Sequence, residues 1–246
     1  AEAIVKSGGK SWKTWAGPHG HRRRIRALMR RLEGDYGPFE PKEPMDPLDG
    51  LVLTILSQAT NDHNSTHAFR RLKARFPRWE QVLEAPREEL VDAIRPGGLA
   101  ENKSTSIRKV LRELETWPSK QDLSSLEHQP IPEALEMLPR LPGVGLKTAS
   151  CVLLFDLERP VMPVDTHVHR LSRRLGLVTP KASADQTHHV LMAITPEEQI
   201  HPFHVWLIAH GRACCRARGP NCRDCGLAEL CPEAVRFESV SEGERR

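Results

Sequence analysis

The chain has 246 residues, of which 39% are hydrophobic and 28% are charged, and its formal net charge at pH 7 is +4. This length is enough for one or two domains with a sizeable core. No apolar run approaches the roughly 20 residues of a membrane span, and the first residues lack the stretch of about 7 apolar residues that a signal peptide needs. We therefore expect a cytoplasmic globular protein with no membrane partner.

Basic charge is concentrated at the start of the chain. Residues 1–30 contain eight Lys or Arg against one acidic residue, Glu2. Such a segment can neutralise phosphates, which would make DNA affinity depend on salt, or it can be a solvated arm. Residues 1–21 are rich in Gly, Ser and Lys without a period, so we expect a disordered extension there.

The following segments have the pattern of helices joined by short loops. A basic helix is expected over 22–33, before a linker over 36–47 whose four prolines exclude a helix or a central strand. Further helices are expected over 48–60, 64–76, 87–94, 101–115, 131–138, 145–157, 166–176, 183–194 and 202–213. In one of them, apolar residues follow the helical spacing i, i+3, i+4, i+7: Ile107, Val110, Leu111 and Leu114. No alternating stretch is long enough for a strand, so we expect an all-α fold.

Residues 141–149, LPGVGLKTA, place a glycine turn between two helices. In such a helix-hairpin-helix, the backbone N–H groups of Gly143, Val144 and Gly145 can face a DNA phosphate. A simple turn between packed helices is the alternative.

Lys147 follows that turn on the first turn of the next helix, where the helix dipole disfavours the ammonium form. A neutral lysine amine is a nucleophile that forms Schiff bases, although a phosphate-binding lysine also suits this position. Asp165 comes immediately before a later helix and is expected to be its N-cap. A cap carboxylate can also accept a proton or stabilise a developing cation.

Four cysteines near the C-terminus have the spacing C-x6-C-x2-C-x5-C: Cys215, Cys222, Cys225 and Cys231. This density in a cytosolic chain indicates a metal site rather than disulfides. Because only one close pair is present, the spacing favours an iron-sulfur cluster over zinc, and both stay open. Cys214 can shift the ligand set by one position, and Cys151 is expected in the core. Arginines next to these cysteines can contact phosphates or form a solvated basic loop: Arg212, Arg216, Arg218 and Arg223.

Three motifs together, LPGVGLKTA, VDTHVHRL and HGRACCRARGPNCRDCGLAELC, resemble endonuclease III, a family of bifunctional DNA glycosylases with AP lyase activity in the helix-hairpin-helix superfamily. The resemblance runs from about Leu48 to Cys231. It implies two helical domains that flank a DNA-binding groove. One is a six-helix domain over 41–159 that contains the hairpin. The other combines the N-terminal helix and linker, 22–40, with residues 160–246 and carries a [4Fe-4S] cluster.

The resemblance also implies roles for single residues. Lys147 would be the nucleophile and Asp165 the carboxylate beside it, and HGRxxC places the first cluster ligand at Cys215. LSQATND makes Gln58 the residue that fills the space of the extruded base, and GGLAENKS makes Leu99 the intercalating side chain. The family often has Asp directly after QAT, whereas this chain has Asn61 and then Asp62.

The implied function is excision of oxidised pyrimidines through a lysine Schiff base, followed by strand cleavage by β-elimination. The expected partner is double-stranded DNA with damaged bases or abasic sites, bound by a monomer. Three alternatives remain open. The first is a monofunctional mismatch glycosylase that uses water and Asp165. The second is a non-catalytic DNA-binding module, and the third is a structural protein whose C-terminal cysteines bind zinc.

Overall fold

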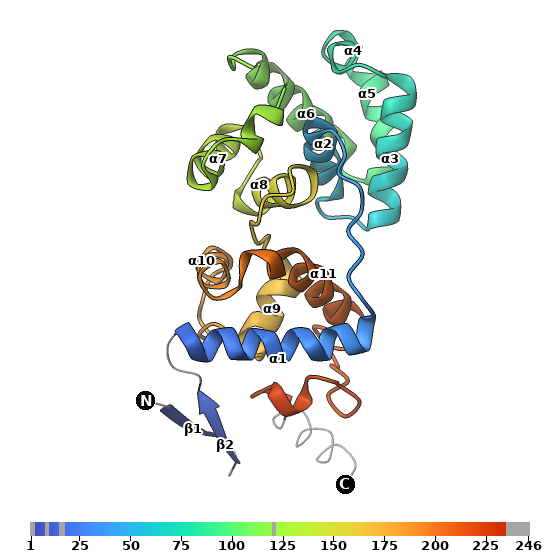
Figure 1. The fold of residues 1–246 in the computed structure, drawn as a ribbon. Coiled ribbons are helices and arrows are strands. Elements are labelled where there is room, and N and C mark those ends of the chain that lie inside the picture. The colour runs from blue at the N-terminus through green and yellow to red at the C-terminus, as the bar shows by residue number, and fades with distance from the viewer. Residues whose placement is uncertain (1–2, 8–9, 15–17, 120–121, 235–246) are drawn as a thin grey trace. The chain divides into compact units, whose positions relative to one another are not determined.

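The computed structural model describes residues 3–7, 10–14, 18–119 and 122–234 (Figure 1). By its internal contacts the chain divides into two compact units. Unit 1 combines Ala1–Pro41 with Pro160–Arg246, and unit 2 is Lys42–Arg159. These boundaries lie within one residue of those expected at 40/41 and 159/160.

Within its described residues, unit 2 has seven α-helices. They are α2 (Pro47–Ser57), α3 (Asp62–Arg75), α4 (Trp79–Glu84), α5 (Arg87–Ile94), α6 (Ala100–Glu115), α7 (Ile131–Met137) and α8 (Leu146–Cys151). Short 3-10 helices occur at η1 (Arg95–Gly97), η2 (Ser124–Glu127) and η3 (Leu138–Arg140), and α8 continues as one π-helical turn, η4 (Val152–Asp156). The expected count of six is therefore wrong, because α4 is too short for its period to stand out in the sequence.

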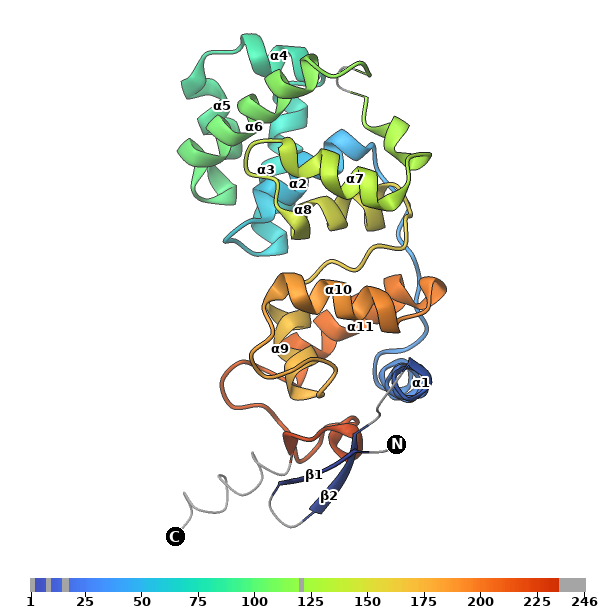
Figure 2. The ribbon, with the colours of Figure 1, turned by 90° about the vertical axis from the view of Figure 1, so that its left-hand side faces the viewer.

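The apolar helix α2 forms the core of unit 2. It contacts α3, α6 and α8, which surround it in Figure 2. Its buried apolar residues are Leu48, Leu51, Val52, Ile55 and Leu56. Asp46 caps its N-terminus, with Oδ1 accepting from the N–H groups of Leu48 and Asp49 at 3.0 and 3.1 Å. A helix that is apolar on most sides is stable only when other helices cover it.

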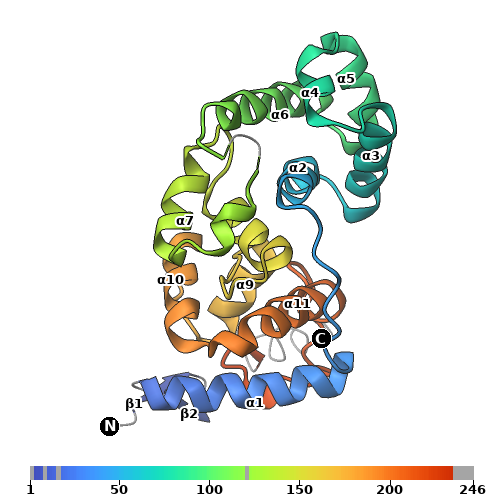
Figure 3. The same cartoon turned by 45° about the horizontal axis from the view of Figure 1, so that its top comes forward.

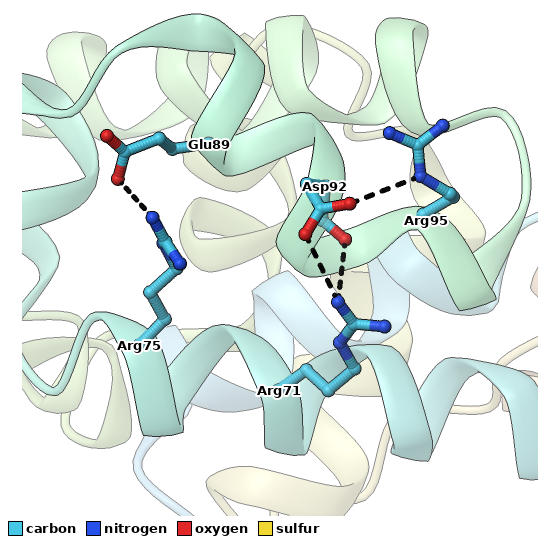
Figure 4. Close-up of polar contacts among 5 residues, drawn as sticks. All are labelled: Arg71, Arg75, Glu89, Asp92 and Arg95. Carbon is cyan, nitrogen blue, oxygen red and sulfur yellow. Dashed lines mark hydrogen bonds and ion pairs between the residues drawn. The ribbon is translucent and has the colours of Figure 1, made fainter.

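Exposed ion pairs join α3 to the segment of α5 and η1 (Figure 4). Arg75 Nη2 lies 2.6 Å from Glu89 Oε2, and Arg71 Nη2 donates to both the carbonyl and a carboxylate oxygen of Asp92. Arg95 Nε contacts the other Asp92 oxygen at 3.4 Å. Pairs in solvent contribute little each, so the apolar contacts of α3 with α2 and α5 set this packing.

Unit 1 contains α1 (Pro18–Tyr36), α9 (Thr166–Arg174), α10 (Ala184–Ile194), α11 (Glu197–Ala213) and the 3-10 helix η5 (Ala228–Leu230). Helix α1 packs on α10 and α11, and α9 packs on α11 (Figure 3). The expected start of α11 at Pro202 is wrong. Pro202 lies inside the helix, which begins five residues earlier at Glu197.

The N-terminal segment differs from the expected disordered extension. Strands β1 (Ala3–Ser7) and β2 (Lys10–Thr14) pair antiparallel, with Ser7 opposite Lys10, and α1 begins at Pro18. Each strand has only five residues, so alternation is a weak signal there, whereas the sequence Gly8-Gly9 between them is typical of hairpin connections. All other regular structure in the described residues is helical, which confirms the all-α class. None of the described helices has the length and hydrophobicity needed to cross a membrane.

Candidate functional site

The hairpin of unit 2 runs from α7 and η3 through a turn at residues 141–145 into α8. Gly143 has φ +81°, a conformation that side chains disfavour, which explains the glycine there. The N–H of Val144 donates to Leu141 O at 3.0 Å, and the Val144 side chain is buried. Gly145 is the N-cap of α8 and has open space at its Cα. The turn therefore presents backbone rather than side chains.

Lys147 is the only exposed residue of α8. The residues that follow it are buried: Thr148, Ala149, Ser150 and Cys151. Burial of Cys151 confirms the core position expected for it. A buried helix thus presents a single amine to solvent, two residues after the glycine turn.

Asp165 is the N-cap of α9, as expected, and Oδ1 accepts from Val168 N at 2.7 Å. The cap uses one carboxylate oxygen, and the side chain is half-buried. Two buried histidines hold the backbone just before it. His188 Nδ1 donates to Met162 O at 2.7 Å, and His204 Nδ1 donates to Pro163 O at 3.0 Å. Burial lowers the pKa of His188, so the neutral ring suits this role.

Lys147 belongs to unit 2 and Asp165 to unit 1. Their pairing is implied by the family resemblance, and it stays a prediction.

Gln58 and Leu99 both lie where a helix of unit 2 meets a loop. Gln58 is exposed at the C-cap of α2 and is followed by Ala59 with φ 53°. Leu99 is the N-cap of α6 with φ 49°, and its 59% exposure is the largest of any large hydrophobic residue described. Asn61 caps α3, with Oδ1 accepting from Asn64 N at 2.8 Å. Because Asn and Asp are equally good caps, the change from Asp after QAT is structurally conservative.

The C-terminal cysteines of unit 1 line one small cavity together with His210 and apolar side chains. These cysteines are Cys214, Cys215, Cys222, Cys225 and Cys231. Ligand atoms of His210, Cys214 and Cys225 all lie within 4.8 Å of one another, which makes them a candidate metal group. The choice between Cys214 and Cys215 therefore stays open.

Two arginines of α9 hold the start of the cysteine loop. Arg170 Nη2 donates to Gly211 O and Cys215 O, both at 3.0 Å, and Arg174 Nη1 donates to Arg216 O at 2.7 Å and Cys215 Sγ at 3.2 Å. A Cβ at Gly211 would lie 2.8 Å from His167 Nδ1. The glycine of HGR therefore permits the close approach of α9 and α11.

Burial shapes the acidity of these thiols. It raises the pKa of Cys214 to about 12 and that of Cys231 to about 11, with smaller contributions from neighbouring cysteines. Thiols are deprotonated when they bind metal, so metal binding would release protons here. The donor set, several thiols with apolar Leu171, Leu175 and Leu227 around them, fits an iron-sulfur cluster or zinc.

The arginines expected to contact DNA are exposed: Arg212, Arg216 and Arg218. Arg24 differs from its basic neighbours because it is only 8% exposed. It donates to the backbone oxygens of Leu175 and Leu230. The sequence grouped Arg24 with the basic residues of 1–30 that can neutralise phosphates. In the structure its guanidinium instead links backbone segments of unit 1.

Comparisons with known proteins agree with this arrangement. Residues 52–197 match the family model of the HhH-GPD superfamily base excision DNA repair protein. The chain is 39% identical over 164 residues to an Arabidopsis thaliana protein named as a DNA glycosylase, covering 67% of this chain and 56% of the plant protein. It is 34% identical over 182 residues to endonuclease III of Thermotoga maritima, covering 74% of this chain and 80% of that protein.

A solved structure of a trapped covalent intermediate of endonuclease III with DNA has a TM-score of 0.75 and 29% sequence identity. It covers 88% of this chain and 98% of its own. The chain belongs to the HhH-GPD superfamily of base excision DNA repair proteins. Its relatives are of the endonuclease III type, which confirms the expected enzyme class, a DNA glycosylase with AP lyase activity.

Proposed function

We propose that the chain excises oxidised pyrimidines from duplex DNA by means of Lys147 and then cleaves the strand by β-elimination. The observation that carries the proposal is the single exposed amine of α8, placed two residues after the glycine turn. The similar structure of a trapped covalent endonuclease III–DNA intermediate supports it, since lysine amines are nucleophiles of the required kind.

In the proposed reaction the Nζ lone pair of Lys147 attacks C1′ of the damaged nucleotide. The C1′–N bond breaks, and the base leaves with the bonding electrons and takes up a proton. Asp165 accepts the proton from Nζ or stabilises the cationic sugar. Opening of the sugar ring gives an imine between Nζ and C1′. Loss of a C2′ proton then breaks the C3′–O bond and expels the phosphate, and water hydrolyses the imine to restore Lys147.

Base extrusion is assigned to Gln58 and Leu99. Unstacking costs a few kcal/mol, least for a damaged or weakly paired base. An exposed hydrophobic side chain such as Leu99 can fill the gap in the stack. The phosphates would contact the N–H groups of Gly143 and Gly145, whereas the N–H of Val144 donates to Leu141 O within the turn. They would also contact three exposed arginines, and these contacts offset the cost of bending the duplex: Arg212, Arg216 and Arg218.

We assign a [4Fe-4S] cluster to four thiols of the C-terminal loop: Cys215, Cys222, Cys225 and Cys231. When bound, such a cluster would cross-link the loop through four thiolate bonds. Arg170 and Arg174 already hold the backbone of this loop at its first residues. The exposed arginines would then lie on a fixed frame, which favours phosphate contacts.

Borohydride trapping tests the proposal. Duplex DNA with thymine glycol or an abasic site is incubated with wild type, Lys147→Gln and Lys109→Gln, which changes an exposed lysine of α6. We expect an adduct with wild type and Lys109→Gln and none with Lys147→Gln, which should still bind the DNA.

The alternatives give different results in the same assay. Base release without an adduct would indicate a monofunctional glycosylase. DNA binding without any product would indicate a non-catalytic binding module. An adduct with Lys147→Gln would refute the assignment of the nucleophile.

A further inference from the structure

Lys103 is the only buried lysine in the described part of the chain, with 4% exposure. Its Nζ donates to Leu56 O at 2.7 Å and to Gly97 O at 2.8 Å. No carboxylate of the described residues lies within ion-pair distance of it. Buried lysines are normally paired with an acid, so an ammonium held only by two carbonyls requires a reason.

The two carbonyls belong to the helix ends that lead into Gln58 and Leu99. Leu56 lies in the last turn of α2, two residues before Gln58, and Gly97 ends η1, two residues before Leu99. Carbonyls at a helix C-terminus lack intrahelical donors and carry the negative end of the helix dipole. The Lys103 ammonium supplies a donor to Leu56 O, and the same nitrogen also donates to Gly97 O before the other loop.

The backbone at Gly97 also lies next to α3 and the last turn of α2. A Cβ at Gly97 would lie 3.1 Å from Ala68 Cβ and 3.9 Å from both Leu56 O and Leu56 Cδ2. Beyond these points the two loops turn through left-handed residues, Ala59 with φ 53° and Leu99 with φ 49°. Such conformations persist in non-glycine residues only where the surroundings hold them.

We propose that Lys103 is a positioning residue that fixes Gln58 and Leu99 relative to each other, so that both side chains enter the duplex as one rigid wedge. The inference rests on the proposed function, because the roles of Gln58 and Leu99 in base extrusion are part of it. Lysine suits the task because one tetrahedral nitrogen carries three donors, and its charge strengthens both hydrogen bonds. Leu56 and Gly97 are 41 positions apart in the chain. The two hydrogen bonds of Lys103 therefore link two loops that are distant in the sequence.

The test compares Lys103→Met with Lys109→Met, which makes the same chemical change at an exposed position of α6. Amide hydrogen exchange is first measured in the DNA-free protein. We expect Lys103→Met to speed exchange at both 57–61 and 97–101 and to leave residues 146–151 unchanged, whereas Lys109→Met changes neither loop. Unchanged exchange at either loop in Lys103→Met would overturn the coupling.

Activity is then measured on two DNAs that differ in their need for base extrusion. Loss of the fixed geometry should reduce kcat for thymine glycol excision by about 10- to 100-fold, with a much smaller loss of borohydride trapping at a preformed abasic site. Equal losses on both DNAs, or full excision activity with loosened loops, would overturn the wedge role. If Lys103→Met does not fold, Lys103→Arg is used, since it keeps a cationic donor but changes its geometry, and the same comparisons apply.

Failure of the proposed function gives a separate result. If wild type forms no adduct on either DNA, the catalytic assignment is wrong. The exchange measurement still decides whether Lys103 couples the loops.

Discussion

The Tyr36 hydroxyl and His210 Nδ1 form a hydrogen bond of 2.9 Å, and His210 Nε2 lies 3.5 Å from Cys225 Sγ. Burial raises the pKa of Tyr36 to about 12 and lowers the pKa of His210. Tyr36 is therefore protonated and His210 neutral. When Cys225 binds the proposed cluster as a thiolate, its sulfur can only accept, so Nε2 would carry the ring proton and Nδ1 would accept from the Tyr36 hydroxyl. Tyr36, the last residue of α1, thereby orients the ring of His210 toward Cys225, a ligand of the proposed cluster.

Tyr36→Phe should remove this orientation while keeping the ring contact, which is edge-on with centroids 5.9 Å apart. We expect the free energy of unfolding to fall by about 1 kcal/mol, the usual net contribution of one hydrogen bond. Thermal unfolding of the protein as isolated, compared with wild type at equal iron content, measures the loss. An identical melting temperature would mean that Nδ1 obtains an equivalent donor from water.

The register of the proposed cluster gives a second prediction. Cys215→Ser should abolish iron binding and the brown colour, whereas Cys214→Ser should retain both, because the motif places the first ligand at Cys215. Iron and sulfide analysis of the two purified variants measures this. The reverse outcome would favour the group of His210, Cys214 and Cys225, whose ligand atoms lie within 4.8 Å of one another.

Local patterns in the sequence predicted much of the fold. The expected apolar positions of α6, residues 107, 110, 111 and 114, are all buried. Asp165 is the cap that its position before an amphipathic segment indicated. These predictions succeed because helix period and capping depend on residues a few positions apart.

Contacts between distant segments were not predictable in this way. Lys103 and Arg24 lie in charged, amphipathic stretches, where the sequence reads as solvated surface, yet both are buried against backbone carbonyls. Leu56 is 47 positions from Lys103 and Leu230 is 206 positions from Arg24. Every residue has a backbone carbonyl, whatever its side chain. The sequence therefore gives no sign of which carbonyl will accept a hydrogen bond from a distant Lys or Arg.

Arg24 gives a third prediction. Arg24→Met would leave Leu175 O and Leu230 O without their buried donor, at about 1 to 3 kcal/mol for each unsatisfied group. We expect unit 1 to lose about 2 to 6 kcal/mol of stability, measured by urea unfolding. Arg23→Met on the same helix is the control, since Arg23 is exposed, and it should behave as wild type. Equal stability of both variants would show that solvent replaces the Arg24 donor.

Asp156 gives a prediction on the pH dependence of stability in unit 2. Its carboxylate packs against α2 so closely that a Cβ at Gly50 would lie 1.9 Å from Oδ2. Burial first, and then the charges of Asp46 and Asp49, raise its pKa from 3.8 to about 7.

The folded chain therefore keeps the Asp156 proton between about pH 4 and 7, where the unfolded chain has lost it. This contribution to stability is complete below about pH 4 and is lost as the pH rises to 7, a change on the order of 4 kcal/mol. Asp156→Asn cannot ionise, so its advantage over wild type in urea unfolding should grow from pH 5 to pH 8. Asp92→Asn, which alters an exposed carboxylate, should show no such growth. Parallel profiles for wild type and Asp156→Asn would mean that Asp156 ionises as readily in the folded chain as in the unfolded one.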